Sequence, residues 1–313
     1  MLNQNSYTSS FRLFLLKVIL QLILLLSISG FMFARMFEKY IILGSQSNGA
    51  YKINRIINQN NKDEIPVLGS SRAENAFVPS LLGKNYFNYG LSGTKYDVTL
   101  FFIEQECLKE KSKPELIINL DYESFEKNIG DISNYLYNAD RPEVKALLGD
   151  KYKFYFGVPF LKYFGQYEGY LKGYINDRIA FTKVPDNGAM LEKNKLPEKQ
   201  FQSLVIQRLS GKYTFNPDTA IFNRMVAIVN KNPDRRFIFV ISPYHSSFFK
   251  SFVNKGVADS FMRRLYTLKN VTLIDFGKRD YPDSLYLNTS HLNYIGAVRF
   301  SYELKDTLYK LGM

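Results

Sequence analysis

Near the N-terminus, one unbroken apolar stretch dominates the pattern of hydrophobic and polar positions. Residues 13–34 contain only two strongly polar side chains, Lys17 and Gln21. A helix rises about 1.5 Å per residue, so about 20 apolar residues cross the hydrocarbon of a bilayer. We therefore expect a transmembrane helix over residues 13–34, preceded by a tail (residues 1–12) and followed by a juxtamembrane helix and linker (residues 35–62).

The residues after the apolar stretch distinguish an anchor from a cleaved signal peptide. A signal peptide has a shorter apolar core, followed by a small-x-small cleavage site. Here Phe31, Met32, Phe33 and Arg35 follow instead, which favours an uncleaved, single-pass anchor. Positive charges flank the stretch on both sides, so the positive-inside rule gives no orientation. Because the N-terminal tail is short, we expect it in the cytoplasm and the large domain outside, on the periplasmic or outer face.

Beyond residue 62, the chain alternates between strand-like and helix-like patterns. Short apolar runs that end at Gly, Pro or Asp predict strands at residues 65–68, 85–89, 116–120, 236–241 and 271–276. Helical spacing of apolar residues predicts helices at residues 96–111, 220–229, 248–268 and 293–311. Strands separated by helices form a mainly parallel sheet flanked by helices. We therefore predict an α/β fold, in one domain over residues 63–313.

The alternation is interrupted between about residues 125 and 215. This segment is crowded with Tyr and Phe, most densely at residues 151–177, and shows no helix or strand regularity. We interpret it as an aromatic-rich insertion that packs its own rings into a small subdomain. The alternative is a surface for the membrane interface or for a partner, since Tyr and Phe suit both places.

Residue counts exclude several kinds of site. The single cysteine, Cys107, cannot form an internal disulfide or a Cys-rich zinc site, and two histidines, His245 and His291, cannot form a three-His metal site. We expect no metal and no cofactor. The net charge of +12 raises nucleic acid as a partner. However, Lys and Arg are dispersed without a basic run, so we expect no nucleic acid but a basic surface near anionic lipid or an acidic glycan.

Candidate catalytic residues lie near the ends of the predicted strands and helices. In parallel sheets, sites lie beyond the carboxyl ends of the strands. Ser71 directly follows the first strand, in Gly-Ser-Ser-Arg, so its hydroxyl is aimed at the mouth of the sheet. His291 precedes the last helix, in Asn-Thr-Ser-His-Leu-Asn. Each signal alone is more often structural, but together they indicate a Ser–His pair.

Three short motifs, in this order, resemble those of the SGNH (GDSL-type) hydrolases. Residues 69–71 (Gly-Ser-Ser) stand where the family has Gly-Asp-Ser, and residues 88–93 (Asn-Tyr-Gly-Leu-Ser-Gly) resemble its N-x-G-x-x-G block. Residues 288–293 (Asn-Thr-Ser-His-Leu-Asn) resemble its Asp-x-x-His block. The resemblance covers nearly all of residues 65–313 except the insertion. It is greatest to a membrane-anchored branch that acylates envelope glycans, which includes relatives of the alginate O-acetylation proteins and of the D-alanyl transfer protein of teichoic-acid modification.

This resemblance implies a flavodoxin-like SGNH fold and a set of residue roles. Ser71 would be the nucleophile, and His291 would be its general base. The backbone N–H groups of Ser71 and Gly93 would hold the oxyanion. The resulting acyl-serine would pass its acyl group to water or to a sugar hydroxyl.

Two positions depart from the family pattern. After the third strand the family's Asn is missing, and residues 120–123 read Leu-Asp-Tyr-Glu, which leaves one oxyanion donor unaccounted for. Asn288 replaces the Asp three residues before His291. In a serine protease the equivalent change costs about 10⁴ in rate, and an amide supplies no charge to the ring. Either the triad is a dyad, or the site is degenerate, or another acid serves: Asp283, Asp275 or Glu123.

Two further residues are candidates for substrate binding. Arg72, beside the nucleophile, either holds a substrate anion or braces the loop through a carboxylate such as Glu74. His245 follows a strand end, in Ser-Pro-Tyr-His. It either lines the acceptor site or serves as an alternative base.

The sequence leads to two functional hypotheses. The first is a membrane-anchored serine acyl esterase or O-acyltransferase that acts on a cell-envelope polysaccharide, with a membrane-bound O-acyltransferase as a partner. The second is a catalytically degenerate SGNH-like scaffold or glycan-binding subunit of an envelope acylation complex. Asn288 favours the scaffold, whereas the presence of both Ser71 and His291 favours the enzyme.

Overall fold

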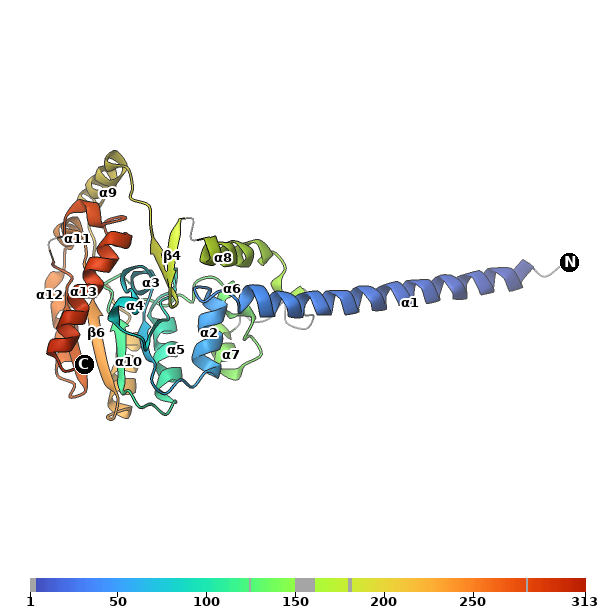
Figure 1. The fold of residues 1–313 in the computed structure, drawn as a ribbon, viewed down its shortest axis with the longest axis horizontal. Coiled ribbons are helices and arrows are strands. Elements are labelled where there is room, and N and C mark those ends of the chain that lie inside the picture. The colour runs from blue at the N-terminus through green and yellow to red at the C-terminus, as the bar shows by residue number, and fades with distance from the viewer. Residues whose placement is uncertain (1–3, 124, 150–160, 180–181, 280) are drawn as a thin grey trace.

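A parallel sheet forms the centre of the protein (Figure 1). The computed structural model describes residues 4–123, 125–149, 161–179, 182–279 and 281–313. Five strands follow the order β2-β1-β3-β6-β7, and every neighbouring pair is parallel. This confirms the predicted α/β class. The strands are β1 (Ile65–Leu68), β2 (Tyr86–Asn88), β3 (Glu115–Asn119), β6 (Arg236–Ile241) and β7 (Val271–Asp275).

Helices cover both faces of the sheet because buried side chains alternate along the strands. In β3, Leu116 and Ile118 belong to one core cluster, and Ile117 between them belongs to the other. One helical layer contains α2 (Gly49–Asn58), α5 (Tyr96–Cys107), α10 (Thr219–Lys231) and α12 (Lys255–Tyr266). The other layer contains α3 (Ser71–Ala76), α4 (Pro79–Leu82) and α13 (Tyr294–Lys310).

The strands and helices predicted beyond residue 62 are found within four residues of their predicted ends, with one exception. The single helix predicted at residues 248–268 is wrong, because the structure has two helices there, α11 (Ser246–Ser251) and α12. Between them the Val253 N–H donates to the carbonyl of Tyr213 at 2.9 Å. The side chain of Asn254 binds two backbone groups of the segment before α10. These contacts with a neighbouring segment stabilise the break between the two helices.

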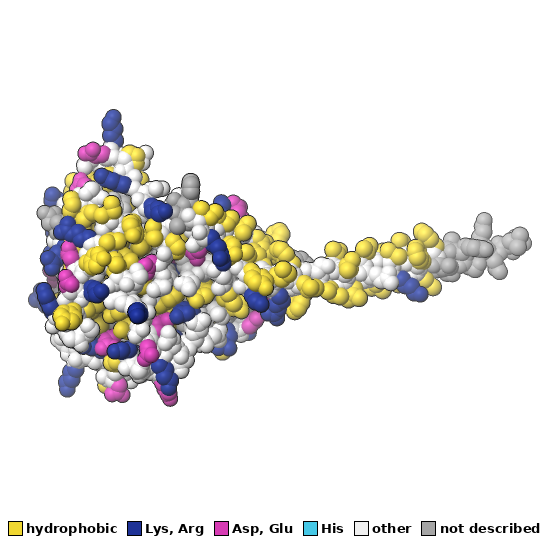
Figure 2. All heavy atoms as spheres, in the orientation of Figure 1, with side chains coloured by type: hydrophobic (Ala, Val, Ile, Leu, Met, Phe, Trp, Pro, Cys, Tyr) yellow, Lys and Arg dark blue, Asp and Glu magenta, His cyan; other side chains and the backbone are white. Residues whose placement is uncertain are grey.

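The N-terminal segment is a long apolar helix that projects from the domain. α1 (Gln4–Phe37) continues into a π-helical turn, η1 (Glu38–Ile42). The part from Phe11 to Ile42 has the length and composition of a membrane span, and its most apolar window is not buried inside the protein. A signal sequence meets the same criteria. Figure 1 shows α1 leading away from the domain, and Figure 2 shows hydrophobic side chains along it, with Lys and Arg scattered over the domain.

The aromatic-rich segment contains more regular structure than the sequence predicted. Rings of Tyr163, Tyr167 and Tyr170 pack around Phe37 at the end of α1, with centroid separations of 5.8, 4.9 and 5.9 Å. Residues 150–160, within the segment, lie outside the described residues. The described elements are α6 (Ser133–Leu136), α7 (Pro142–Leu148), η3 (Leu161–Tyr163), α8 (Tyr167–Ile179), β4 (Lys183–Asp186), β5 (Ala189–Glu192) and α9 (Glu198–Ser210).

β4 and β5 form an antiparallel hairpin that the sequence analysis missed. Its turn residues, Asn187 and Gly188, both have positive φ, at 40° and 89°. Asn-Gly is the preferred pair for a two-residue hairpin turn with positive φ at both positions. The carbonyl of Asn187 accepts the N–H of Asn88 at 2.8 Å, so the hairpin is attached to the end of β2.

A buried ion pair joins α2 to α3, the helix that begins at Ser71. The segment expected to be a juxtamembrane helix and linker contains α2, which is part of the core, and its Lys52 side chain is fully buried. The Lys52 ammonium donates to Glu74 of α3 at 2.7 Å and to the Gly90 carbonyl at 2.5 Å. The other carboxylate oxygen of Glu74 accepts the Ser92 hydroxyl. One buried pair thus links α2, α3 and the turn after β2.

Removing one member of this pair should destabilise the protein strongly. Lys52→Met leaves Glu74 buried without its cation, which should cost about 3–5 kcal/mol in the free energy of unfolding. The double variant Lys52→Met/Glu74→Gln should recover part of this loss, because no unpaired buried charge remains. Denaturant unfolding of the full chain, followed by circular dichroism, measures both. A loss below about 1 kcal/mol for Lys52→Met would contradict the buried pair.

Candidate active site

Ser71 lies at the carboxyl end of β1, where the sequence predicts it. It is the first residue of α3. Gly69 has a φ of 150°, and a Cβ there would approach that of Ala73 to 2.8 Å, so the turn requires glycine. Ser70 caps α3 by accepting a backbone N–H at 3.3 Å, and its hydroxyl donates to Asp121 at 2.9 Å. These contacts fix the start of the helix and therefore the position of the Ser71 hydroxyl.

The turn after β2 is held against α3 by the first residues of the 88–93 motif. The amide of Asn88 donates to the carbonyls of Ala73 at 2.8 Å and Phe77 at 3.0 Å. Its oxygen accepts the N–H of Gly90 at 2.8 Å. A Cβ at Gly90 would collide with the backbone of α3. The Asn and the first Gly of the motif therefore have structural roles at this turn.

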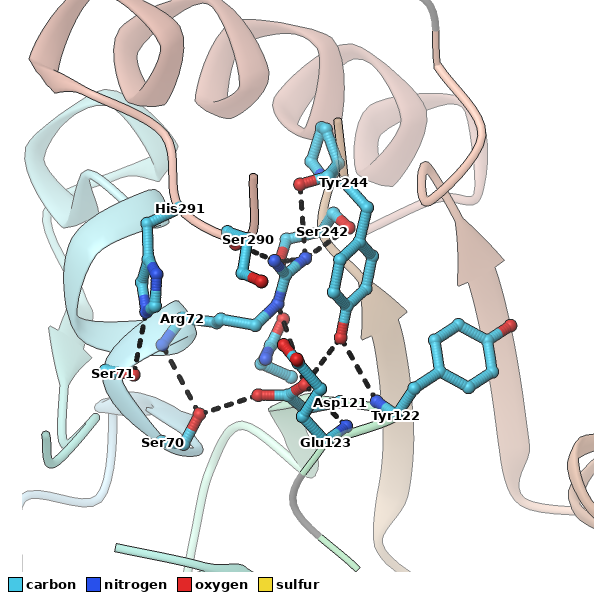
Figure 3. A network of polar contacts seen from close by, with 12 residues as sticks. Ser70, Ser71, Arg72, Asp121, Tyr122, Glu123, Ser242, Tyr244, Ser290 and His291 are labelled. Carbon is cyan, nitrogen blue, oxygen red and sulfur yellow. Dashed lines mark hydrogen bonds and ion pairs between the residues drawn. The ribbon is translucent and has the colours of Figure 1, made fainter. Parts of the chain in front are cut away.

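Ser71 and His291 meet across the sheet edge although 220 positions separate them. The Ser71 hydroxyl lies 2.9 Å from His291 Nε2, which is hydrogen-bond distance for a nucleophile and its base. In Figure 3 the imidazole stands directly above Ser71, on the loop that leads into α13. Both side chains are partly exposed. The structure thus brings together the two residues on which the sequence-based site depends.

Asn288 determines which nitrogen of His291 carries the proton. Its Oδ1 accepts the backbone N–H groups of Ser290 and His291, both at 2.9 Å. Two N–H donors identify this atom as the amide oxygen, because an amide NH₂ cannot accept them. The same oxygen lies 3.1 Å from His291 Nδ1, so Nδ1 must carry hydrogen in the neutral ring. Nε2 then presents its lone pair to the Ser71 hydroxyl, which is the tautomer that a general base requires.

The three carboxylates considered as alternative acids have other partners. Asp283 lies 3.1 Å from Nε2 of His245. Glu123 forms an ion pair with Arg208 at 3.2 Å. Asp275, at the end of the edge strand β7, accepts a backbone N–H at 2.7 Å. The amide oxygen of Asn288 is therefore the group that orients the imidazole of His291.

Arg72 lies at the centre of the site and joins the segments that carry the two reactive residues. It is 3% exposed. Its guanidinium carbon lies 3.4 Å from the ring centroid of Tyr244, and its Nε lies 3.8 Å from Asp121 (Figure 3). Its terminal nitrogens donate to oxygens of three residues: Ser290, Ser242 (2.7 and 2.8 Å) and Pro243 (3.1 Å).

These contacts decide between the two roles proposed for Arg72. The bracing role is the one observed, with Asp121 as the carboxylate. Glu74, the partner suggested by the sequence, pairs instead with Lys52. A guanidinium buried among protein acceptors has little free donor capacity for a substrate anion. Arg72 therefore stabilises the site.

His245 has a structural role in the fold. Its Nδ1 accepts the Ser247 N–H at 3.2 Å and caps α11, while its Nε2 faces Asp283. Its ring packs edge-on against Phe201 of α9 and against Tyr286. With both nitrogens occupied within the protein, the ring has no lone pair to offer as an alternative base, contrary to the sequence-based suggestion.

The environment of the site keeps His291 neutral. Burial, and next the positive charge of Arg72, lower the pKa of His291 to about 4, against opposing effects of Asp121 and Glu74. Burial would raise the pKa of Asp121, but Arg72 and the hydrogen bonds from Tyr244 and Ser70 outweigh it and hold that pKa below its usual value. At neutral pH the site thus contains a neutral imidazole and an ionised aspartate.

A cavity of about 270 Å³ opens in front of Ser71 and His291. Gly93, the predicted oxyanion residue, lines it together with Lys95 and Glu123. Gly93 has a φ of 76° and open space around a would-be Cβ, so backbone conformation rather than crowding requires glycine there. The oxyanion roles of the Ser71 and Gly93 N–H groups stay predictions. Among the described residues, no group of three or more His, Cys, Asp or Glu side chains could hold a metal ion.

Arg208, at the end of α9, is a residue of the site that the sequence analysis missed. Its guanidinium donates to the hydroxyls of Thr289 at 3.2 Å and Ser290 at 3.1 Å, and to Glu123 at 3.2 Å. It therefore helps to fix the loop that carries His291, through side-chain hydroxyls, whereas Arg72 binds a backbone carbonyl of the same loop. No sequence signal marked it, because a lone Arg on an exposed helix is ordinary.

Comparisons with known proteins give little further information. No family model matches the chain, and no curated protein matches it. Solved structures that match include one described as a platelet activating factor from Streptococcus pneumonia, at 12% identity and a TM-score of 0.43, covering 89% of this chain and 99% of that one. Another is an acetyl xylan esterase from the rumen bacterium Butyrivibrio proteoclasticus, at 10% identity and a TM-score of 0.29, covering 80% of this chain and 64% of that one. Neither similarity is strong enough to support a conclusion about chemistry.

The ionisation of His291 can be measured without any substrate. Because the chain has two histidines, a His245→Gln variant assigns their NMR signals. We expect His291 to titrate with a pKa of about 4, since burial and Arg72 disfavour the imidazolium. Asn288→Asp should raise this pKa, because a carboxylate beside Nδ1 favours the charged ring. A wild-type His291 pKa near the ordinary value of about 6.5 would contradict the described environment.

Proposed function

We propose that this protein is a membrane-anchored serine acyl esterase or O-acyltransferase of the SGNH type. It forms an acyl-serine intermediate on Ser71 and acts on a cell-envelope polysaccharide. The observation that carries the proposal is the 2.9 Å contact between the Ser71 hydroxyl and His291 Nε2, in a ring whose tautomer Asn288 fixes. The three motifs that resemble the SGNH family, in the same order along a parallel sheet, support the same reaction class.

The first half of the reaction acylates Ser71. His291 Nε2 removes the hydroxyl proton while the Ser71 oxygen attacks the acyl carbonyl. The N–H groups of Ser71 and Gly93 stabilise the negative charge on the carbonyl oxygen. The imidazolium then gives its proton to the departing alkoxide, and the acyl-serine remains. In the second half, His291 removes a proton from water or from a sugar hydroxyl, which attacks the acyl-serine.

The amide at position 288 makes this a slower version of the triad. In serine proteases, the change from Asp to Asn costs about 10⁴ in rate, largely because the imidazole adopts the wrong tautomer. Here the amide oxygen accepts from Nδ1, so the tautomer is correct. The missing contribution is the carboxylate charge that stabilises the imidazolium. His291 is consequently a weak base that stays available at neutral and mildly acidic pH.

The apolar helix α1 anchors this activity in the membrane. Its length and composition suit a span, and the aromatic rings around Phe37 attach the helix to the domain. In this proposal the site faces the periplasm or the outer surface, where envelope glycans lie. A membrane-bound O-acyltransferase is the partner that would supply acyl groups there.

The second candidate is a non-enzymatic scaffold that binds an envelope glycan. Two observations favour it: the amide at position 288, and the pKa of His291, which is lowered to about 4. Both reduce the driving force for proton removal from Ser71. Reactivity of the Ser71 hydroxyl decides between the two candidates.

A serine-reactive fluorophosphonate probe tests this reactivity directly. We expect it to label the full chain in detergent at one site, because the His291 lone pair activates Ser71. Ser71→Ala should abolish the labelling, and His291→Ala should slow it about 10²- to 10⁴-fold. Ser246→Ala, which removes an exposed serine hydroxyl, is the matched control and should label normally. A folded wild-type chain that stays unlabelled would leave the scaffold as the better proposal.

A second test places a carboxylate at position 288. It should increase activity, whereas the substitutions of Ser71 and His291 should reduce it. Asn288→Asp should accelerate hydrolysis of 4-nitrophenyl acetate, by less than about 10⁴, because only the charge is regained and the tautomer is already correct. The acid limb of its pH–rate profile should lie at higher pH than that of the wild type, since the carboxylate raises the pKa of His291. An unchanged rate and profile would show that His291 is not the base.

A further inference from the structure

Two cavities adjoin at His291. The smaller one contains Ser71, as described above. The larger one, of about 590 Å³, lies beneath the end of α9 and is within the usual size range of ligand sites. His291 and Glu123 line both cavities. The other lining residues that determine its chemistry are Leu204, Gln207, Lys212, Tyr213 and Asn288.

We infer that the larger cavity is the acceptor site, where a saccharide hydroxyl is held for transfer of the acyl group from Ser71. This inference rests on the proposed function, and it makes the protein a transferase rather than an esterase. The smaller cavity, which contains the nucleophile and Gly93, holds the acyl-serine. A base that lines both cavities can serve both half-reactions without moving.

The transfer step balances with groups already in place. His291 Nε2 takes the proton of the acceptor hydroxyl, and the acceptor oxygen bonds to the carbonyl carbon of the acyl-serine. The bond from that carbon to the Ser71 oxygen then breaks. The proton passes from Nε2 to the Ser71 oxygen, which restores the hydroxyl. No further reactant is needed.

The wall of the larger cavity suits a saccharide. Leu204 and Tyr213 contribute apolar surface for the C–H faces of a sugar ring. Gln207 and Lys212 are exposed hydrogen-bonding side chains on the same wall. Tyr213 is held by its hydroxyl, which donates to a backbone carbonyl at 2.6 Å, so its ring forms a fixed platform. A mixture of apolar and polar groups on a fixed surface is what a hydroxyl-rich ligand requires.

Asn288 contributes to this wall as well as to the orientation of His291. Its oxygen is used by Nδ1 and two backbone N–H groups. Among the described residues, no acceptor is paired with its NH₂ group, and the residue lines the larger cavity. The amide therefore offers two donors to an acceptor molecule, which a carboxylate at this position would not. This gives the amide at position 288 a function in place of the missing charge.

Filling the larger cavity tests the inference. Leu204→Phe places a ring inside it, whereas Ile206→Phe, two positions along α9, adds the same ring at a side chain that is 66% exposed and lines neither cavity. The full chain in detergent receives 4-nitrophenyl acetate as donor and either cellotriose or trigalacturonate as acceptor. The nitrophenolate burst reports acylation of Ser71, and mass spectrometry reports the acetylated saccharide.

We expect Leu204→Phe to keep the burst and to lower acetyl transfer to the saccharide about tenfold or more relative to Ile206→Phe. Equal transfer in the two variants would overturn the inference, as would a wild-type burst with neither saccharide acetylated. Loss of the burst in Leu204→Phe would mean that the acyl group occupies the larger cavity, and this would also overturn the inference. Absence of any Ser71-dependent nitrophenolate release in the wild type, as a burst or as steady turnover, would instead overturn the proposed function.

A second pair of variants makes smaller changes, so that the test still holds if Leu204→Phe prevents folding. Gln207→Ala removes one exposed polar side chain from the wall, and Gln200→Ala removes another exposed glutamine side chain elsewhere on α9. Gln207→Ala should raise the KM for the saccharide several-fold and leave the burst unchanged, while Gln200→Ala changes neither. An unchanged KM in Gln207→Ala, together with unchanged transfer in Leu204→Phe, would place the acceptor elsewhere.

Discussion

The buried guanidinium of Arg72 holds the two halves of the site together. A buried cation costs several kcal/mol unless it is paired and fully hydrogen-bonded. Here the ion pair with Asp121, the ring of Tyr244 and the oxygens of the loops after β6 and before α13 oppose that cost, although Arg72 Nε has no hydrogen-bond partner among the described residues. Because Ser71 precedes Arg72 and His291 follows one of its acceptors, the same contacts set the distance between the Ser71 hydroxyl and the His291 ring. The charge of Arg72 also disfavours the imidazolium, so the residue that assembles the site weakens its base.

Asn288 shows how a triad position can keep its geometric role and lose its electrostatic one. The amide oxygen is fixed by two backbone N–H groups and in turn fixes the ring of His291. Orientation of the imidazole therefore survives without the carboxylate, while stabilisation of its charged form does not. In the proposed reaction, a site of this kind would activate Ser71 more slowly than a triad with a carboxylate. Its amide also faces the cavity that we assign to the acceptor.

Much of this arrangement could be predicted from local sequence patterns. The five parallel strands were found because their runs are apolar on both faces. Ser71 was found because it follows one of these strands, and His291 because it precedes the last helix. Contacts across the fold gave no local signal: Lys52 and Arg208 are ordinary helix residues in the sequence, and only the tertiary structure gives them buried or bridging partners. The roles of Arg72 and His245 depend on the same kind of contact. The hairpin at Asn187 was a different case, since its Asn-Gly turn is a recognisable signal.

Proton removal from Ser71 requires that the neutral ring of His291 carries its hydrogen on Nδ1 and leaves Nε2 free. Nitrogen NMR of the ¹⁵N-histidine-labelled full chain, at neutral pH, distinguishes a protonated nitrogen from one with a free lone pair. We expect hydrogen on Nδ1, facing Asn288, and a lone pair on Nε2, facing Ser71. Hydrogen on Nε2 would mean that His291 donates to Ser71 and cannot remove its proton, and the proposed acyl transfer would be excluded.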